Sequence, residues 1–174
     1  GIAHGTVNKE IGLMSAALNW AKRELEWDVA NPWAARRQVE PAGQDRWLTP
    51  GEAARLLTAA SARRDRYPWL LDFIRLGLNS GLRPGEMLGL EWRRVDLKAG
   101  VVAFEAGRQK NGKAGRVALN HEARDALLTR ARFRASHCPT SPWVFCRRDG
   151  TRIMSMKIGF AGCVKAAGLT DVHP

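Results

Sequence analysis

Arg83 is the residue whose surroundings in the sequence most strongly suggest chemistry. It is separated by one residue from Asn79-Ser80-Gly81, a combination that ends helices, and it precedes Pro84, which is favoured in the first turn of the next helix. A guanidinium group is planar, permanently charged and able to hold two phosphate oxygens together. Glu86, three residues further on, is placed to orient it. The pattern predicts an anion site; the alternative is an ordinary surface Arg–Glu pair on a short helix.

A second candidate is a basic turn in the middle of the chain. Four basic residues fall within nine positions with no acidic residue among them: Arg108, Lys110, Lys113 and Arg116. A basic β-hairpin suits a DNA groove or a phosphate backbone, whereas a merely solvated turn is the alternative. A lysine in such a place also suits a general acid toward a leaving oxygen, once a neighbouring arginine lowers its pKa.

Other reactive side chains support fewer expectations. Tyr67 is the only tyrosine, and its place just before Pro68 at the start of an apolar helix predicts a packing role. The histidines lack partners at metal-ligand spacing, and no G-x-x-x-x-G-K phosphate loop is present. Three cysteines without C-x-x-C spacing favour neither a metal site nor a disulfide framework: Cys138, Cys146 and Cys163. We therefore expect no metal, no cofactor and no use of ATP.

The charge of the chain predicts a polyanionic partner. Lys and Arg number 28 against 17 Asp and Glu, which gives a formal net charge of +11 over 174 residues. Such an excess suits nucleic acid, because neutralising phosphates releases condensed counterions. No apolar run is long enough to span a bilayer, and the unpaired cysteines fit a reducing cytoplasm. A cytoplasmic nucleic-acid-binding protein with no membrane partner is the expectation.

The helical elements come first in the chain. Apolar residues at spacings of three and four predict a helix over Thr6–Trp27, followed by an aperiodic linker over Trp33–Arg46. We therefore expect two domains, 1–40 and 41–174. Thr49 and Glu52 have the spacing of a capping box that opens the next helix. The stretch Trp69–Leu78 is apolar nearly all round and predicts a central buried helix.

The second half of the chain predicts a small sheet between helices. β-prone runs at Val101–Phe104 and Val117–Leu119 flank Asn111-Gly112, a strong hairpin-turn signal. A helix with Ala123, Leu127 and Ala131 facing inward should follow. We then expect a short strand at Trp143–Cys146 and a last helix at Ser155–Ala167. The predicted fold class is mainly α with a small antiparallel β-sheet (α+β).

Taken in order, these motifs resemble those of the tyrosine recombinase, or phage integrase, family. Ser80–Trp92 resembles the first arginine box of that family, T-G-x-R-x-x-E followed by L-x-W. Gln109–Lys113 resembles its hairpin lysine motif, T-K-x-G-K, which continues here as Val117–Leu119. Arg46–Thr49 with Glu52 resembles the start of its catalytic domain. The helix that ends near Asn31-Pro32 resembles the end of its helical core-binding domain.

The resemblance implies a metal-free transesterification on double-stranded DNA. In that family a tyrosine attacks a phosphodiester, forming a 3′-phosphotyrosyl link and a free 5′-hydroxyl, while arginines stabilise the developing charge. By this resemblance Arg83 is the first catalytic arginine, Lys110 protonates the departing oxygen, and Glu86 supports Arg83. The basic turn itself predicts DNA contacts from Arg108, Lys113 and Arg116. The resemblance also implies a tetramer on DNA for the intact protein, with this piece a monomer.

One departure from the family pattern limits these expectations. The second box, H-x-x-R, should begin just after Val172-His173-Pro174, where the given sequence stops. We expect a truncated catalytic domain that binds DNA at an attachment or recombination site but does not cleave it. The alternatives are a non-catalytic DNA-binding prophage relic or accessory module, a type IB topoisomerase, and a transcriptional regulator. The regulator would leave Arg83 and Lys110 together unexplained.

Overall fold

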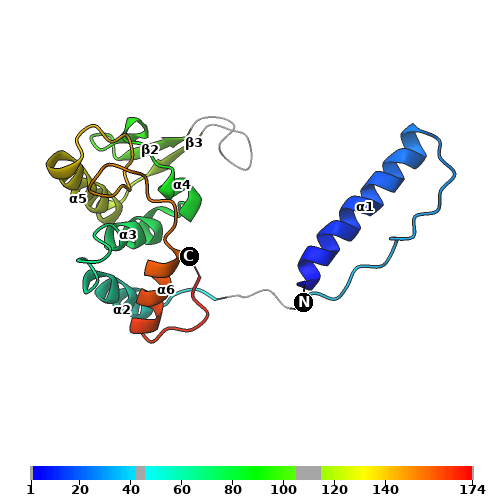
Figure 1. The fold of residues 1–174 in the computed structure, drawn as a ribbon, viewed down its shortest axis with the longest axis horizontal. Coiled ribbons are helices and arrows are strands. Elements are labelled where there is room, and N and C mark those ends of the chain that lie inside the picture. The colour runs from blue at the N-terminus through cyan, green and yellow to red at the C-terminus, as the bar shows by residue number, and fades with distance from the viewer. Residues whose placement is uncertain (1, 42–45, 105–114, 174) are drawn as a thin grey trace. The chain divides into compact units, whose positions relative to one another are not determined.

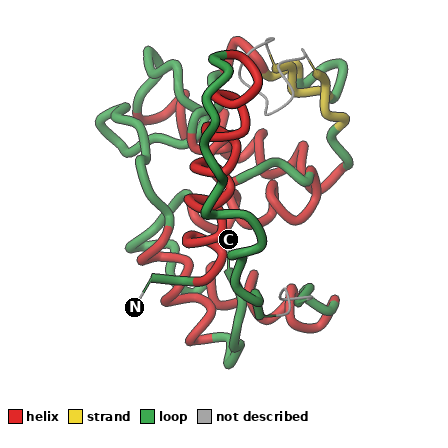
Figure 2. Tube along the Cα trace, turned by 90° about the vertical axis from the view of Figure 1, so that its right-hand side faces the viewer, coloured by secondary structure: helices red, strands yellow, loops and turns green. Residues whose placement is uncertain are grey.

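The computed structural model describes residues 2–41, 46–104 and 115–173, and the chain divides into two compact units. Unit 1 is Gly1–Asp45 and unit 2 is Arg46–Pro174. Helices are the main secondary structure of the described chain, and the strands are confined to one small region (Figure 2). In the described part, no helix is long and apolar enough to cross a membrane.

Unit 1 is a single helix with a segment packed along it. Helix α1 spans His4–Glu24 and ends before Glu26, whose positive φ of 54° cannot continue a helix. The expectation that this helix reaches Trp27 is therefore wrong at its C-terminal end. The chain then returns along α1 (Figure 1), where the side chain of Asn8 donates to the carbonyl of Gln38 at 2.8 Å and accepts from its N–H at 2.7 Å. Part of the expected linker is thus bonded to the helix before it.

Unit 2 begins with the predicted capping box. Helix α2 spans Pro50–Ser61, and the N–H of Glu52 donates to the hydroxyl of Thr49 at 3.3 Å. In return the N–H of Thr49 donates to the Glu52 carboxylate at 2.9 Å. Arg46 pairs with the same carboxylate at 2.8 Å. The spacing of Thr49 and Glu52 therefore correctly predicted how this helix starts.

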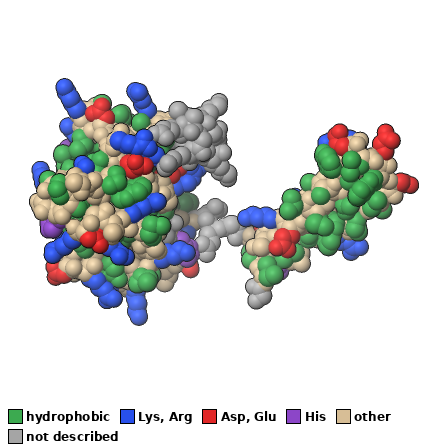
Figure 3. Space-filling view, turned by 45° about the horizontal axis from the view of Figure 1, so that its top comes forward, with side chains coloured by type: hydrophobic (Ala, Val, Ile, Leu, Met, Phe, Trp, Pro, Cys, Tyr) green, Lys and Arg blue, Asp and Glu red, His purple; other side chains and the backbone are tan. Residues whose placement is uncertain are grey.

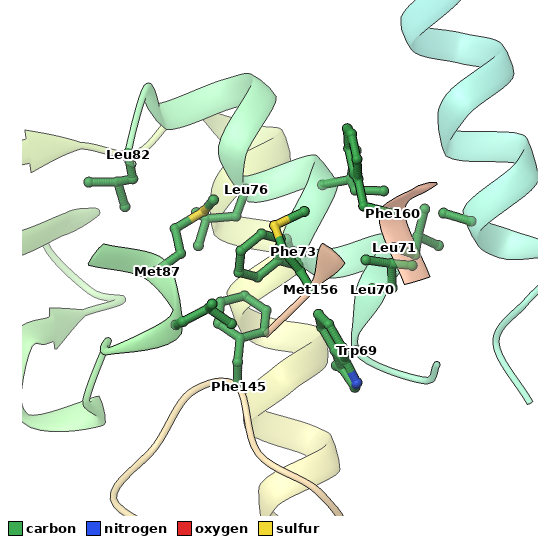
Figure 4. Close-up of a cluster of buried hydrophobic side chains, with 14 of the residues drawn as sticks. Trp69, Leu70, Leu71, Phe73, Leu76, Leu82, Met87, Phe145, Met156 and Phe160 are labelled. Atoms are coloured by element: carbon green, nitrogen blue, oxygen red, sulfur yellow. The ribbon is translucent and has the colours of Figure 1, made fainter. Parts of the chain in front are cut away.

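Helix α3, Leu70–Ser80, is the centre of the core, as its apolar sequence predicts. Side chains from helix α4 (Pro84–Leu88), from the loop after helix α5 (His121–His137) and from helix α6 (Lys157–Ala166) pack against those of α3 (Figure 4). Phe73 lies edge-on between Trp69 and Phe145, with ring centroids 5.8 and 5.0 Å away. Leu78, which was expected inside, is 43% exposed because it borders an open apolar groove rather than lying under a neighbouring helix.

The sheet is a three-stranded antiparallel meander in the order β1-β2-β3. Its strands are β1 Val95–Asp96, β2 Val101–Phe104 and β3 Gly115–Ala118. A 3₁₀ turn at Trp92–Arg94 leads into β1. In β2 the side chains of Val102 and Phe104 are buried, as the alternation of a one-sided sheet requires. The predicted turn at Asn111-Gly112 lies outside the described residues.

The last part of the chain differs from the sequence prediction at one element. Helix α5 spans His121–His137, and helix α6 spans Lys157–Ala166. The strand expected at Trp143–Cys146 is absent, and that segment makes only isolated bridges, Glu91 with Trp143 and Cys146 with Arg152. It changes hydrogen-bonding partner within four residues, so no continuous ladder can form. The predicted class, mainly α with a small antiparallel sheet, is confirmed.

Candidate active site around Arg83

Arg83 is held at a corner between two helices. Gly81 ends α3 in the left-handed conformation, with φ of 65°, which a residue with a side chain adopts only at a cost. Arg83 then serves as the N-cap of helix α4, Pro84–Leu88, in extended conformation. Ser80 braces the corner, since its hydroxyl donates to the carbonyl of Leu76 at 2.6 Å and accepts from the N–H of Leu82 at 3.3 Å.

Glu86 fixes both the backbone and the side chain of Arg83. One carboxylate oxygen accepts from the Arg83 N–H at 2.9 Å, and the other accepts from Nη1 at 3.0 Å. The Arg83 side chain is 65% exposed, whereas that of Glu86 is only 17% exposed. Since a guanidinium has five N–H donors, the contact with Glu86 leaves donors for an incoming anion. The arrangement presents an oriented positive group to solvent.

The far end of α4 is fixed by Arg152, which the sequence analysis did not single out. Its Nε donates to the carbonyl of Leu88 at 2.7 Å, and its guanidinium lies 4.8 Å from the ring centroid of Trp143. A Cβ at Gly89 would approach an Arg152 nitrogen to 3.0 Å, so this arginine packs closely against the glycine. A contact across 64 residues leaves no spacing signal in the sequence.

An apolar groove lies beside the corner that carries Arg83. Its volume is about 180 Å³, and among its lining residues are Leu82 and Pro84, which flank Arg83, and His173. Met87 of α4 and Gly77 of α3 both line this groove, and a Cβ at Gly77 would be 3.1 Å from the Met87 methyl group. The Arg83 box and the segment preceding the expected H-x-x-R box, far apart in the sequence, therefore meet at one place in unit 2.

The basic hairpin is described only at its base. Arg116 lies exposed on β3, opposite Ala103 on β2. Within the described ranges no hydrogen bond or ion pair links it to Glu86. Arg108, Lys110 and Lys113 lie outside the described residues. Of the predicted site residues, the structure thus brings Glu86 against Arg83 and places Arg116 on the sheet.

Tyr67 occupies a packing position between α2 and α3. Its ring meets that of Trp69 edge-on, with the centroids 6.5 Å apart. The guanidinium carbon of Arg66 lies over the Tyr67 ring, 5.5 Å from the ring centroid. A Cβ at Gly159 would be 3.5 Å from the Tyr67 ring, so α6 also contacts it. These packing contacts explain the position of Tyr67, and no chemical role is needed to explain it.

Two ionisable residues are buried in the core of unit 2. Asp72 on α3 and Arg130 on α5 are 2% and 1% exposed. Burial raises the pKa of Asp72 to about 6, while the positive charges of Arg130, Arg64 and Arg75 oppose that rise. Arg130 donates to the carbonyls of Val144 and Cys146, each at 3.3 Å. Its charge therefore holds the loop after α5 against the core.

Basic side chains dominate the charged surface of unit 2 on the face shown in Figure 3. Lys and Arg side chains project from it in several places, with fewer acidic side chains between them. In the described part, no three His, Cys, Asp or Glu residues are grouped so as to hold a metal ion. The surface is suited to a phosphate-rich partner.

Comparison with known proteins identifies the family. The model of the phage integrase family matches residues 46–174, more than half of the chain, so the protein belongs to the phage integrase, or tyrosine recombinase, family. The shufflon-specific DNA recombinase of Escherichia coli is 33% identical over 129 residues, covering 72% of this chain and 32% of that protein. Tyrosine recombinase XerC of Pseudomonas aeruginosa (strain LESB58) is 31% identical over 156 residues, covering 84% and 48%.

Solved structures share the fold at lower sequence identity. A Tn1549 transposon integrase in complex with transposon right end DNA has a TM-score of 0.77 at 18% identity, covering 100% of this chain and 62% of that one. A lambda integrase tetramer bound to a Holliday junction has a TM-score of 0.72 at 18% identity, covering 98% and 50%. The fold is that of the tyrosine recombinase catalytic domain. The chain spans about a third to a half of the curated relatives named above.

Proposed function

We propose that this chain is the part of a site-specific DNA recombinase that grips duplex DNA and supplies one arginine to the scissile phosphate. The observation that carries the proposal is the pose of Arg83, which is 65% exposed while Glu86 fixes its backbone and one of its nitrogens. An arginine held this way needs little reorganisation when charge develops on phosphorus oxygens, and such preorganisation is a major source of catalysis.

The reaction proposed for the intact protein is a transesterification. A tyrosine oxygen attacks phosphorus, the bond to the 5′ oxygen breaks, and the DNA is left with a 3′-phosphotyrosyl link and a free 5′-hydroxyl. Arg83 stabilises the oxygens of the phosphorane-like transition state, and Lys110 gives a proton to the departing 5′ oxygen. Glu86 keeps Arg83 in place. The contacts that hold the DNA backbone come from Arg108, Lys113 and Arg116.

The two halves of the chain have different tasks in this proposal. Residues 41–174 form part of the catalytic domain, and residues 1–40 are the end of a helical core-binding domain with its linker. His173 supports the assignment of the catalytic domain, because it lines the same groove as Leu82 and Pro84. A segment that follows it would start beside Arg83. We propose a tetramer on DNA for the intact protein and a monomer for residues 1–174.

A nicked duplex tests whether residues 1–174 bind DNA without cutting it. The chain is incubated with the nicked DNA, and the products are run on native gels and on denaturing gels. We expect a shifted band on the native gel and no covalent adduct after denaturation. The absence of any shift at low salt would contradict DNA binding. An adduct that disappears in Tyr67→Phe would contradict the packing role of Tyr67, since it is the one tyrosine in these 174 residues.

A further inference from the structure

Two of the three cysteines meet inside unit 2. The sulfur atoms of Cys138 and Cys146 are 3.4 Å apart, and the two residues are 6% and 1% exposed. The third, Cys163, is equally buried on α6, and no contact with another sulfur is seen for it within the described ranges. The odd number of cysteines had argued against a disulfide framework. The fold nevertheless selects one pair.

The pairing is built by the path of the chain around Arg130. Cys138 caps the end of α5, its N–H donating to the carbonyl of Arg134 at 2.9 Å. The chain turns at Ser141, whose N–H donates to the Cys138 carbonyl at 3.0 Å, and comes back alongside the helix. Arg130 then holds the returning segment by donating to the Cys146 carbonyl at 3.3 Å. Backbone bonds on both sides thus hold the two sulfurs in contact.

We propose that Cys138 and Cys146 are a modification site, a dithiol that peroxide converts to an intramolecular disulfide. The Cys138 sulfur, the more exposed of the two, attacks hydrogen peroxide; the O–O bond breaks, and a sulfenic acid and water result. The Cys146 sulfur then attacks the Cys138 sulfur, and the S–O bond breaks. The oxygen leaves as water with the proton of Cys146. Two thiols and one peroxide thus give one disulfide and two waters.

Forming the disulfide requires only a small movement of the two sulfur atoms, whereas their buried surroundings make the oxidation slow. A disulfide has a sulfur separation of about 2.05 Å, so rotation about the two Cα–Cβ bonds has little distance to close. Burial and the neighbouring Cys146 raise the pKa of the Cys138 thiol to about 11, and Arg130 and Arg134 oppose that rise. Thiolate is therefore scarce near neutral pH, and the pair reacts with added peroxide rather than spontaneously in air.

Peptide mapping tests the proposal directly on residues 1–174. The folded chain is treated with hydrogen peroxide, unfolded in N-ethylmaleimide and digested with trypsin. Cleavage after Arg134 and Arg147 leaves both cysteines in peptide 135–147, and cleavage after Lys157 and Lys165 isolates Cys163 in peptide 158–165. We expect peptide 135–147 to lose two hydrogens and take no maleimide. Peptide 158–165 should still carry one maleimide.

Variants separate the pair from general oxidation. Cys163→Ala should keep the cross-link, whereas Cys146→Ala should leave Cys138 as a thiol or a higher oxide without loss of two hydrogens. The thermal midpoint of the oxidised wild-type chain should rise and return after dithiothreitol. Peptide 135–147 carrying two maleimides after Cys163 has oxidised would overturn the proposal, as would oxygen addition in place of hydrogen loss. The wild-type map decides the question even if a variant fails to fold.

Discussion

The side chain of Arg152 ends the helix that Arg83 begins. Its Nε donates to the carbonyl of Leu88 at 2.7 Å, at the last residue of α4, while Arg83 is the N-cap at the first. A helix of five residues has little stability of its own, because the first turn costs more entropy than its hydrogen bonds return. The position of Arg83 therefore depends on contacts at both ends of α4.

Replacing Arg152 should loosen this helix. Arg152→Ala removes a charged donor from a partly buried carbonyl, so we expect the free energy of unfolding to fall by about 1–3 kcal/mol. Amide exchange should quicken over Met87–Gly89. Urea denaturation and hydrogen exchange measure the two effects. Arg148→Ala, an exposed arginine in the same region, is the matched control and should change stability by less than about 0.5 kcal/mol. Equal losses in both variants would contradict the role given to Arg152.

Glu86 should contribute through its carboxylate oxygens. Glu86→Ala leaves the Arg83 N–H without its acceptor, and we expect a loss of about 1 kcal/mol in unfolding free energy. Glu86→Gln should lose less, since the amide oxygen can still accept that N–H. Glu122→Ala serves as the control, because the Glu122 carboxylate is 58% exposed and 3.7 Å from Arg75. If the Gln variant were as unstable as the Ala variant, the hydrogen bond to the Arg83 N–H would not be the source of the stability that Glu86 contributes.

Arg83 should contribute measurably to the salt dependence of DNA binding. The slope of log affinity against log salt is negative, and each phosphate contact makes it steeper by about 0.9, so Arg83→Ala should make it shallower by about one. Fluorescence anisotropy with a labelled duplex at several salt concentrations gives the slope. Arg93→Ala removes the same charge from a similar pair, in which Arg93 is 58% exposed and contacts a Glu91 carboxylate that is 16% exposed. A slope change of the same size in both variants would point to net charge and not to the Arg83 site.

Stability should depend on the protonation of Asp72. Burial raises its folded-state pKa to about 6, whereas an unfolded aspartate has a pKa of about 3.9. Between these values the folded protein holds the proton and the unfolded chain releases it. The stability associated with Asp72 is therefore fully present below about pH 4 and is lost as pH rises through 6. Asp72→Asn should remove this dependence.

The quantity that tests this prediction is the difference in unfolding free energy between wild type and Asp72→Asn. From pH 4 to pH 7 that difference should move against the wild type by on the order of 2–3 kcal/mol. Urea denaturation at several pH values measures it. Asp65→Asn, at an exposed position, should show no such trend. A wild-type curve parallel to that of Asp72→Asn would mean that Asp72 stays ionised throughout.

Sequence patterns predicted the features that depend on near neighbours. The capping box of Thr49 and Glu52, the end of the helix at Gly81 and the pairing of Arg83 with Glu86 each involve residues a few positions apart, so the sequence alone predicts them. The resemblance to the integrase family rested on these local motifs in their order along the chain, and the family model confirmed it.

Features that depend on contacts between residues far apart in the sequence could not be predicted from local patterns. Arg130 looks like a solvent-facing residue of a charged helix, yet the fold buries it because Val144 and Cys146 supply carbonyl acceptors. Arg152 reaches Leu88 across 64 residues. The expected strand at Trp143–Cys146 has the right composition but no continuous partner. In each case the deciding information lies in how the chain folds back on itself.

The register of β2 and β3 has a consequence for the placement of Arg116. Phe104 pairs directly with Gly115, so the sheet holds together both ends of the segment 105–114. The register of Val102 and Arg116 is set by the pairing of β2 with β3 and by the burial of Val102 beneath it. The sheet therefore places Arg116 by contacts within the described strands alone.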